Sequence, residues 1–116
     1  MARTERRSTK RVRAKYEINF IHEGDYLISF SKDISVDGMF IQTDNFPDVG
    51  DTTTLTFSIG DLNKVSVDAK VVWVNDVEST KDAGMGVRFV NPPKYLKETI
   101  LKIVNRVAVL ESKGVA

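Results

Sequence analysis

Apolar and polar side chains alternate along most of the chain, in short runs separated by residues that favour turns. Alternation with a period of two residues is typical of a β-strand that buries one face. Six such runs predict six strands, at residues 15–22, 26–34, 38–43, 54–59, 65–73 and 87–90. In the second run, Tyr26, Ile28 and Phe30 share one face, which we expect to point inward. In the fifth run, Trp73 continues the apolar face that includes Val71.

The period changes after residue 91, where apolar side chains recur mostly every three or four positions. This spacing places one apolar stripe along a helix, which we predict over residues 92–113. The stripe contains Leu96, Ile100, Ile103, Val104, Val107 and Leu110. We expect the stripe to pack on the sheet, and the alternative is a helix–helix contact in a homodimer.

These elements predict an all-β fold with a C-terminal helix. Six short strands joined by short turns favour a six-stranded antiparallel β-barrel, because closure protects the strand edges. The helix is expected to pack on or beside this barrel. A length of 116 residues is that of one domain. Within it, residues 1–14 are expected to form a basic flexible arm, residues 15–91 the barrel and residues 92–113 the helix.

Charge is distributed unevenly between the arm and the rest of the chain. Residues 1–15 contain seven basic residues and one acidic residue, which gives this segment a charge of +6. The whole chain has a formal net charge of +1, so the remaining residues carry −5. Such an arm is typical of a solvated tail, or of a segment that becomes ordered on an anion. The anion could be nucleic acid, a membrane surface or a phosphorylated small molecule.

The composition excludes several classes of function. The chain has no Cys, which rules out disulfides, thiolate metal ligands and cysteine nucleophiles. His22 is the single histidine, and no pair of carboxylates stands out as an acid and a base. We therefore expect no enzyme, no metal and no other cofactor. Because the chain has neither an apolar run long enough to span a membrane nor a secretory signal, we expect a cytoplasmic protein.

The glycines of Gly84-Met85-Gly86 resemble part of a phosphate-binding loop. They lead into a predicted strand, however, whereas a phosphate cradle needs the N-terminus of a helix. We therefore expect them to allow a bulge or a close approach at the start of the last strand.

Two short motifs carry the candidate chemistry. The first is Arg7-Ser8-Thr9-Lys10-Arg11, in which two arginines stand four residues apart. The second is Asp33-Ile34-Ser35-Val36-Asp37-Gly38, in which Asp and Ser are expected to cap backbone amides and Gly to take a positive φ. Each motif alone is common, the first in basic tails and the second in turns.

Together, and in this order, the two motifs resemble those of the PilZ domain, a family of receptors for the bacterial second messenger cyclic di-GMP. The resemblance runs from about Glu5 to Phe89 and includes the segments Val71-Val72-Trp73-Val74 and Gly84-Met85-Gly86-Val87-Arg88-Phe89. It implies a β-barrel with a C-terminal helix. It also implies a cyclic di-GMP site formed by Arg7, Arg11, Asp33, Ser35 and Gly38.

The chemistry of these residue types suits that ligand. The planar guanidinium groups of Arg7 and Arg11 can pair with O6 and N7 of guanine or with phosphate oxygens. The ionised carboxylate of Asp33 can accept hydrogen bonds from N1 and N2 of guanine. The Ser35 hydroxyl can donate to a phosphate, and Gly38 lets the base approach without a Cβ in the way.

Three further residues are weaker candidates for ligand contacts. Arg6 could meet a phosphate or a second ligand molecule, or it could remain solvated. Trp73 could stack on a guanine, or it could belong to the core. Arg88 could touch the ligand, or it could be an ordinary surface residue.

The expected function is that of a small cyclic di-GMP receptor or adaptor. Ligand binding would order the arginine arm against the barrel and create a surface for a protein partner. One alternative is a nucleic-acid-binding barrel with a basic arm, which we disfavour because the barrel aromatics are predicted to face inward. The other is a degenerate PilZ-like interaction module that binds no ligand, against which the intact motifs argue.

Overall fold

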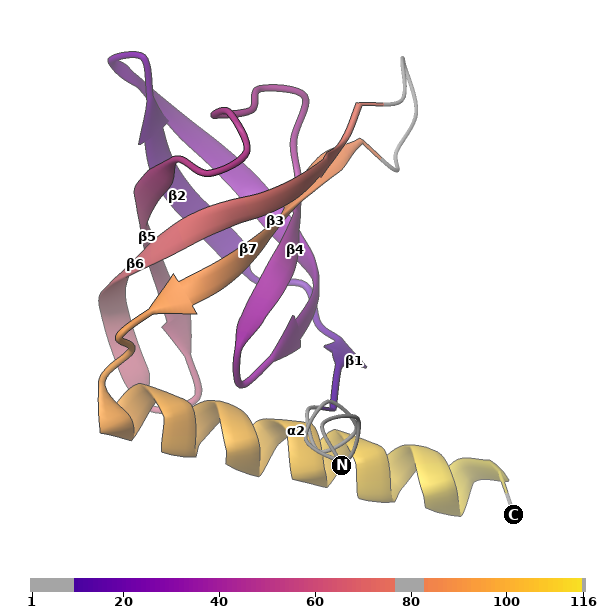
Figure 1. The fold of residues 1–116 in the computed structure, drawn as a ribbon. Coiled ribbons are helices and arrows are strands. Elements are labelled where there is room, and N and C mark those ends of the chain that lie inside the picture. The colour runs from indigo at the N-terminus through magenta and orange to yellow at the C-terminus, as the bar shows by residue number, and fades with distance from the viewer. Residues whose placement is uncertain (1–9, 77–82, 116) are drawn as a thin grey trace, which may run out of the picture.

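The computed structural model describes residues 10–76 and 83–115, with side chains up to Val107 (Figure 1). The strands are β1 Val12–Arg13, β2 Glu17–His22, β3 Asp25–Ser35, β4 Gly38–Gln42, β5 Thr52–Ile59, β6 Leu62–Asn75 and β7 Gly84–Val90, and the helix is α2 Lys94–Val115. The predicted six-stranded antiparallel β-barrel with a C-terminal helix is confirmed. The short strand β1 is an addition that the sequence pattern did not predict.

The barrel closes because β3 pairs with neighbours on both of its edges. The strands follow the order β3-β2-β5-β6-β7-β4, and β4 pairs back onto β3. The first half of β3 pairs with β2, and β1 pairs with the second half, where Val12 lies opposite Ile34. Residues 12–14, which we expected within the arm, are therefore held on β3, and Val12 is buried in the core. This pairing brings the chain just before β1 next to the turn between β3 and β4 (Figure 1).

Helix α2 lies across one end of the barrel and continues past it (Figure 1). Its predicted stripe packs on the barrel as expected, since Leu96, Ile100 and Val104 are fully or almost fully buried. The carbonyl of Pro93 accepts the backbone N–H groups of the first helical turn, so the helix begins slightly later than predicted. Within the described residues, no helix is long and apolar enough to cross a membrane.

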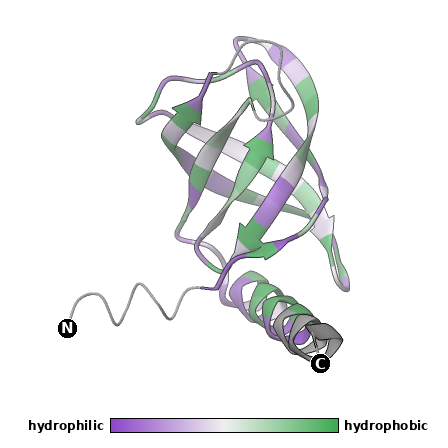
Figure 2. Ribbon diagram, turned by 90° about the vertical axis from the view of Figure 1, so that its right-hand side faces the viewer, coloured by the Kyte–Doolittle hydropathy of each residue, from purple (hydrophilic) through white to green (hydrophobic). Residues whose placement is uncertain are grey.

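Hydrophobic and hydrophilic residues alternate along the barrel strands (Figure 2), but the predicted face of β3 is wrong. Tyr26, Ile28 and Phe30 point outward and expose 65%, 60% and 40% of their surface. The cause is the two-residue turn Glu23-Gly24, in which both residues have positive φ. This turn fixes the register of the β2–β3 hairpin.

In that register the buried Phe20 lies opposite Leu27, and the buried Ile18 lies opposite Ser29. Residues directly opposite each other on neighbouring strands share a face. Leu27, Ser29 and Ser31 therefore point inward. The buried Ser31 hydroxyl has hydrogen-bond partners there, because it donates to the carbonyl of Ala14 and accepts the N–H of Tyr16.

Partial burial of Tyr16 raises the pKa of its phenol above the usual value.

The sequence left two positions open for Trp73, the core and the surface, and in the structure Trp73 lies at the surface. The pairing of β6 with β7 contains an irregularity between Val71 and Trp73, which has the character of a β-bulge. Val71 is fully buried, whereas Val72 and Trp73 are both exposed, and half of the Trp73 surface is accessible. The bulge interrupts the alternation and moves the indole to the outside of the barrel.

Candidate functional site

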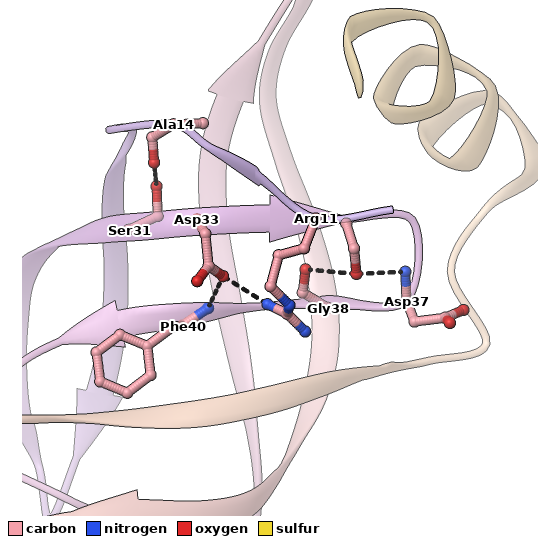
Figure 3. Close-up of polar contacts among 8 residues, drawn as sticks. Arg11, Ala14, Ser31, Asp33, Asp37, Gly38 and Phe40 are labelled. Carbon is pink, nitrogen blue, oxygen red and sulfur yellow. Dashed lines mark hydrogen bonds and ion pairs between the residues drawn. The ribbon is translucent and has the colours of Figure 1, made fainter. Parts of the chain in front are cut away.

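The carboxylate of Asp33, on β3, is held from two sides (Figure 3). Its Oδ1 atom accepts the backbone N–H of Phe40 at 3.2 Å and a guanidinium N–H of Arg11 at 2.5 Å. Arg11 comes from the segment just before β1, and its side chain is half exposed. The structure therefore brings together one residue from each of the two motifs, on the outside of the barrel.

Ser35 lies inside the turn rather than at its surface. The side chain is fully buried, and its hydroxyl donates to the carbonyl of Gly38 at 3.4 Å and accepts the N–H of Asp37 at 3.2 Å (Figure 3). Both hydrogen bonds stabilise the connection between β3 and β4. The hydroxyl is thus used within the turn, and the geometry does not provide the direct phosphate contact that we expected.

Gly38 has a different role from the one its motif suggested. Its φ is not positive, unlike those of Gly24, Gly50 and Gly60. Gly38 instead begins β4 at a point where a Cβ atom would collide with the backbone carbonyl oxygen of Val87 on β7. Glycine is required here because the two strands approach each other closely.

Beside Asp33 the outer surface forms an open groove of about 490 Å³. Its lining comprises Arg11, Lys32, Asp33, Phe40, Val72, Trp73, Asn75, Gly86 and Val87. The rings of Phe40 and Trp73 stack with their centroids 5.2 Å apart and their planes at 28°. Lys32 lies over the Phe40 ring, with its Nζ atom 6.0 Å from the centroid.

The groove thus combines a flat aromatic surface with ionic groups of both signs. A planar base can stack on the indole, the carboxylate can accept hydrogen bonds from it, and Arg11 and Lys32 can pair with phosphate. Among the side chains that the structure describes, in residues 10–76 and 83–107, acidic and histidine residues form no cluster of three that could hold a metal ion. The stacking surface and the charged groups of the groove could together bind a planar ligand that carries phosphate.

The structure unites some of the predicted site residues and separates others. Arg11, Asp33 and Trp73 line the same groove. Arg88 is exposed on β7 opposite Gly38, and it is not among the residues that line the groove. Arg6 and Arg7 lie outside the described residues.

Phe40 and Lys32 also line the groove, and our reading of the sequence did not identify them. Phe40 pairs with Asp33 across β3 and β4, so an outward Asp33 implies an outward Phe40. That pairing requires the register across the turn, which the motif alone does not provide. Nothing in the sequence around Lys32 distinguishes it from other surface lysines.

The PilZ domain model matches residues 5–106, and the chain therefore belongs to the PilZ domain family. No curated protein sequence matches the chain. Among solved structures, the chain is similar to the Bacillus subtilis inhibitor of motility MotI/DgrA, with 16% identity and a TM-score of 0.76 over 90% of this chain and 51% of that one.

Two further similar structures contain cyclic di-GMP. The PilZ domain of YcgR from Escherichia coli has 18% identity and a TM-score of 0.67, over 93% of this chain and 98% of that one. MrkH from K. pneumonia, solved as a complex with cyclic di-GMP, has 18% identity and a TM-score of 0.68, over 93% of this chain and 54% of that one. The chain spans about half the length of MotI/DgrA and of MrkH. At these identities the similarity shows a shared fold.

Proposed function

We propose that the chain is a receptor for cyclic di-GMP that acts without catalysing a reaction. The observation that carries this proposal is the groove in which Arg11 and Asp33 lie beside the exposed face of Trp73. Membership of the PilZ family supports it, as do the cyclic di-GMP complexes of YcgR and MrkH. The ligand needs no metal or other cofactor in this site.

The guanine base is assigned to the indole of Trp73 and the carboxylate of Asp33. A carboxylate has about four lone-pair positions on its two oxygens, and Oδ1 already accepts Phe40 and Arg11. These two hydrogen bonds orient the carboxylate, so that Oδ2 can accept the N1 and N2 donors of guanine. Ser35 and Gly38 contribute by shaping the turn that holds Asp33.

The phosphates are assigned to the arginines of the arm. Arg7 and Arg11 carry fixed positive charges and planar donor groups that match phosphate oxygens. Arg6 is assigned to a further phosphate contact, and Arg88 receives none because it lies outside the groove. Binding of the arm across the groove would form a new surface, which we propose as the contact for a protein partner in the cytoplasm.

The C-terminal helix offers less surface for a homodimer than its sequence suggests. Leu96, Ile100 and Val104 are already buried against the barrel. The side chain of Leu110 lies outside the described part of the chain. These three residues of the stripe are therefore not available for a helix–helix contact.

The proposal is tested by parallel calorimetric titrations with cyclic di-GMP, GTP and a short single-stranded oligonucleotide. We expect saturable binding of cyclic di-GMP and much weaker binding of the other two. Absence of cyclic di-GMP binding would overturn the proposal and leave the degenerate interaction module as the remaining PilZ function.

Nucleic-acid binding is the second candidate function, and one observation favours it. Tyr26, Phe30 and Trp73 are exposed on the outside of the barrel, which removes the objection that the aromatics face inward. Exposed aromatics and a basic arm are the usual elements of single-strand binding. This candidate requires oligonucleotide binding that weakens steeply as the salt concentration rises.

Replacing Asp33 by Ala is expected to reduce the preference for guanine over adenine. Loss of the acceptor for N1 and N2 should weaken cyclic di-GMP binding by about 10-fold, while cyclic di-AMP binding changes little. Because the Phe40 N–H also loses its acceptor, stability should fall by about 1 kcal/mol. Titration of both dinucleotides against the variant measures the preference, and urea unfolding measures the stability.

Asp68→Ala is a matched control, since Asp68 accepts a hydrogen bond from Thr54 on the outside of β6, away from the groove. It should leave the base preference unchanged. An unchanged preference in Asp33→Ala as well would show that Asp33 serves only to stabilise the turn.

Ligand binding is expected to order the first part of the arm. Amides of residues 3–9 should exchange hydrogen rapidly in the free protein and slowly with cyclic di-GMP, because Arg7 becomes fixed on the ligand. Residues 12–14 should be protected in both states, since they are already held on β3. Residues 55–74 should change little. Hydrogen exchange measured by mass spectrometry tests this, and equal protection of residues 3–9 in both states would exclude the switch.

A further inference from the structure

The two aromatic residues of the groove, Phe40 and Trp73, both lie opposite Gly86, which has no side chain. Gly86 on β7 pairs with Phe40 on β4 and with Trp73 on β6. Residues directly opposite each other on neighbouring strands share a face. A side chain at position 86 would therefore enter the outer face of the barrel, in the space where the two rings stack.

The indole of Trp73 fills this space. A methyl group at position 86 would lie 2.6 Å from Cδ1 and 2.8 Å from Cε2 of Trp73, and closer still to Nε1. These three atoms form the N–H edge of the indole, so this edge lies directly over the backbone of Gly86. Glycine is the one residue that permits this approach.

Gly84 accommodates the other ring in the same way. A methyl group at position 84 would lie 2.5 Å from Cζ and 2.6 Å from Cε2 of Phe40, and closer still to the backbone carbonyl oxygen of Ile41. Between the two glycines, Met85 points inward and is fully buried. The Gly84-Met85-Gly86 segment thus places its one large side chain in the core and leaves the outer face clear for two aromatic rings.

We propose that Gly86 is a positioning residue, which lets the indole of Trp73 lie close against β7 and stack on Phe40. The bulge in β6 turns Trp73 outward, and the absence of a side chain at Gly86 allows the indole to approach β7 and stack on Phe40. The exposed face of the indole becomes a flat surface for a planar purine base. This last step rests on the proposed function, whereas the position of the indole does not.

The position of the indole can be measured without ligand, because Trp73 is the single tryptophan of the chain. In Gly86→Ala the added methyl group should lift the ring from the backbone. We expect a red-shifted emission maximum, faster quenching by acrylamide and an altered near-UV circular dichroism spectrum. Val90→Ala, on the same strand and the same exposed face, should leave all three unchanged. Wild-type spectra in Gly86→Ala would overturn the proposal.

Binding of cyclic di-GMP is then compared in Gly86→Ala, Trp73→Ala and the double variant. Stacking of a base on an aromatic side chain is worth about 1–3 kcal/mol, so each single variant should bind about 10-fold more weakly. If Gly86 acts through the indole, the double variant should bind no more weakly than Trp73→Ala. Losses that simply multiply would contradict the proposal.

The same set of variants covers the case in which Gly86→Ala does not fold. Removal of the indole frees the space above position 86, so the double variant should then regain cooperative unfolding. Failure of the double variant to fold would show that the backbone itself requires glycine, and would overturn the positioning role. If the wild type does not bind cyclic di-GMP, the proposed function fails, while the ligand-free spectra still test Gly86.

Discussion

Replacing Arg7 or Arg11 by Ala is expected to weaken cyclic di-GMP binding by about 10- to 100-fold. Each arginine would lose charge-assisted hydrogen bonds, which are worth about 1.5–3 kcal/mol. The melting temperature of the free protein should change little. Arg11 is half exposed in its ion pair with Asp33, and exposed ion pairs contribute at most about 1 kcal/mol. Calorimetric titration and thermal unfolding measure the two effects separately.

Lys10→Ala and Arg11→Lys separate the guanidinium groups from the general charge of the arm. Lys10 stands within the first motif and carries the same charge, so its loss should weaken binding much less than loss of Arg11. Arg11→Lys keeps the charge but loses the planar donor pair, and it should bind almost as weakly as Arg11→Ala. Equal losses in Lys10→Ala and Arg11→Ala would mean that the arm acts only through its net charge.

The strand pattern predicted the barrel because most of its strands bury one face. Residues such as Ile18, Phe20, Leu55 and Phe57 are buried where the period of two places them. The closed sheet follows from the number of strands and their short connections. The pattern did not predict strand β1, because its two residues, Val12 and Arg13, are too few to show an alternation of apolar and polar side chains.

The face of β3 was assigned wrongly because hydrophobicity and register disagree there. Tyr26, Ile28 and Phe30 are large, and the serines Ser29 and Ser31 alternate with them, so the pattern alone places them inside. The register of the β2–β3 hairpin instead requires Leu27 and its alternate neighbours to face inward, because the Glu23-Gly24 turn places Leu27 opposite the buried Phe20. The turn was readable in the sequence, and its length gives the correct face once Phe20 is known to be buried.

The geometry of the candidate site could not be predicted from the sequence. The motifs located Arg11 and Asp33 but did not indicate that their side chains form an ion pair with each other. The position of Trp73 depends on the bulge after Val71, and a bulge inserts one residue without changing the composition of a strand. The role of Gly38 depends on β7, which is about fifty residues away in the sequence. Features that arise from the pairing of distant strands cannot be read from a local motif.

Gly38 is the position where the local motif and the structure predict different behaviour. The turn motif suggests a glycine that gives the ligand room, so that Gly38→Ala would lose binding but fold normally. In the structure, a methyl group at Gly38 would collide with the carbonyl oxygen of Val87. It would also lie 3.0 Å from the carbonyl carbon of Val87 and 3.1 Å from the Cα atom of Arg88. All three are backbone atoms of β7, and they are fixed by the pairing of β4 with β7 that helps close the barrel.

Gly38→Ala is therefore expected to destabilise the free protein by about 3 kcal/mol, because the strands must separate to admit the methyl group. Urea unfolding without ligand measures this loss. Gly50→Ala is the control, since a methyl group there would meet no atom within 4 Å and only its positive φ carries a cost, of about 1 kcal/mol. A Gly38→Ala variant as stable as the wild type, but unable to bind cyclic di-GMP, would contradict the packing role and restore Gly38 as a residue that admits the ligand.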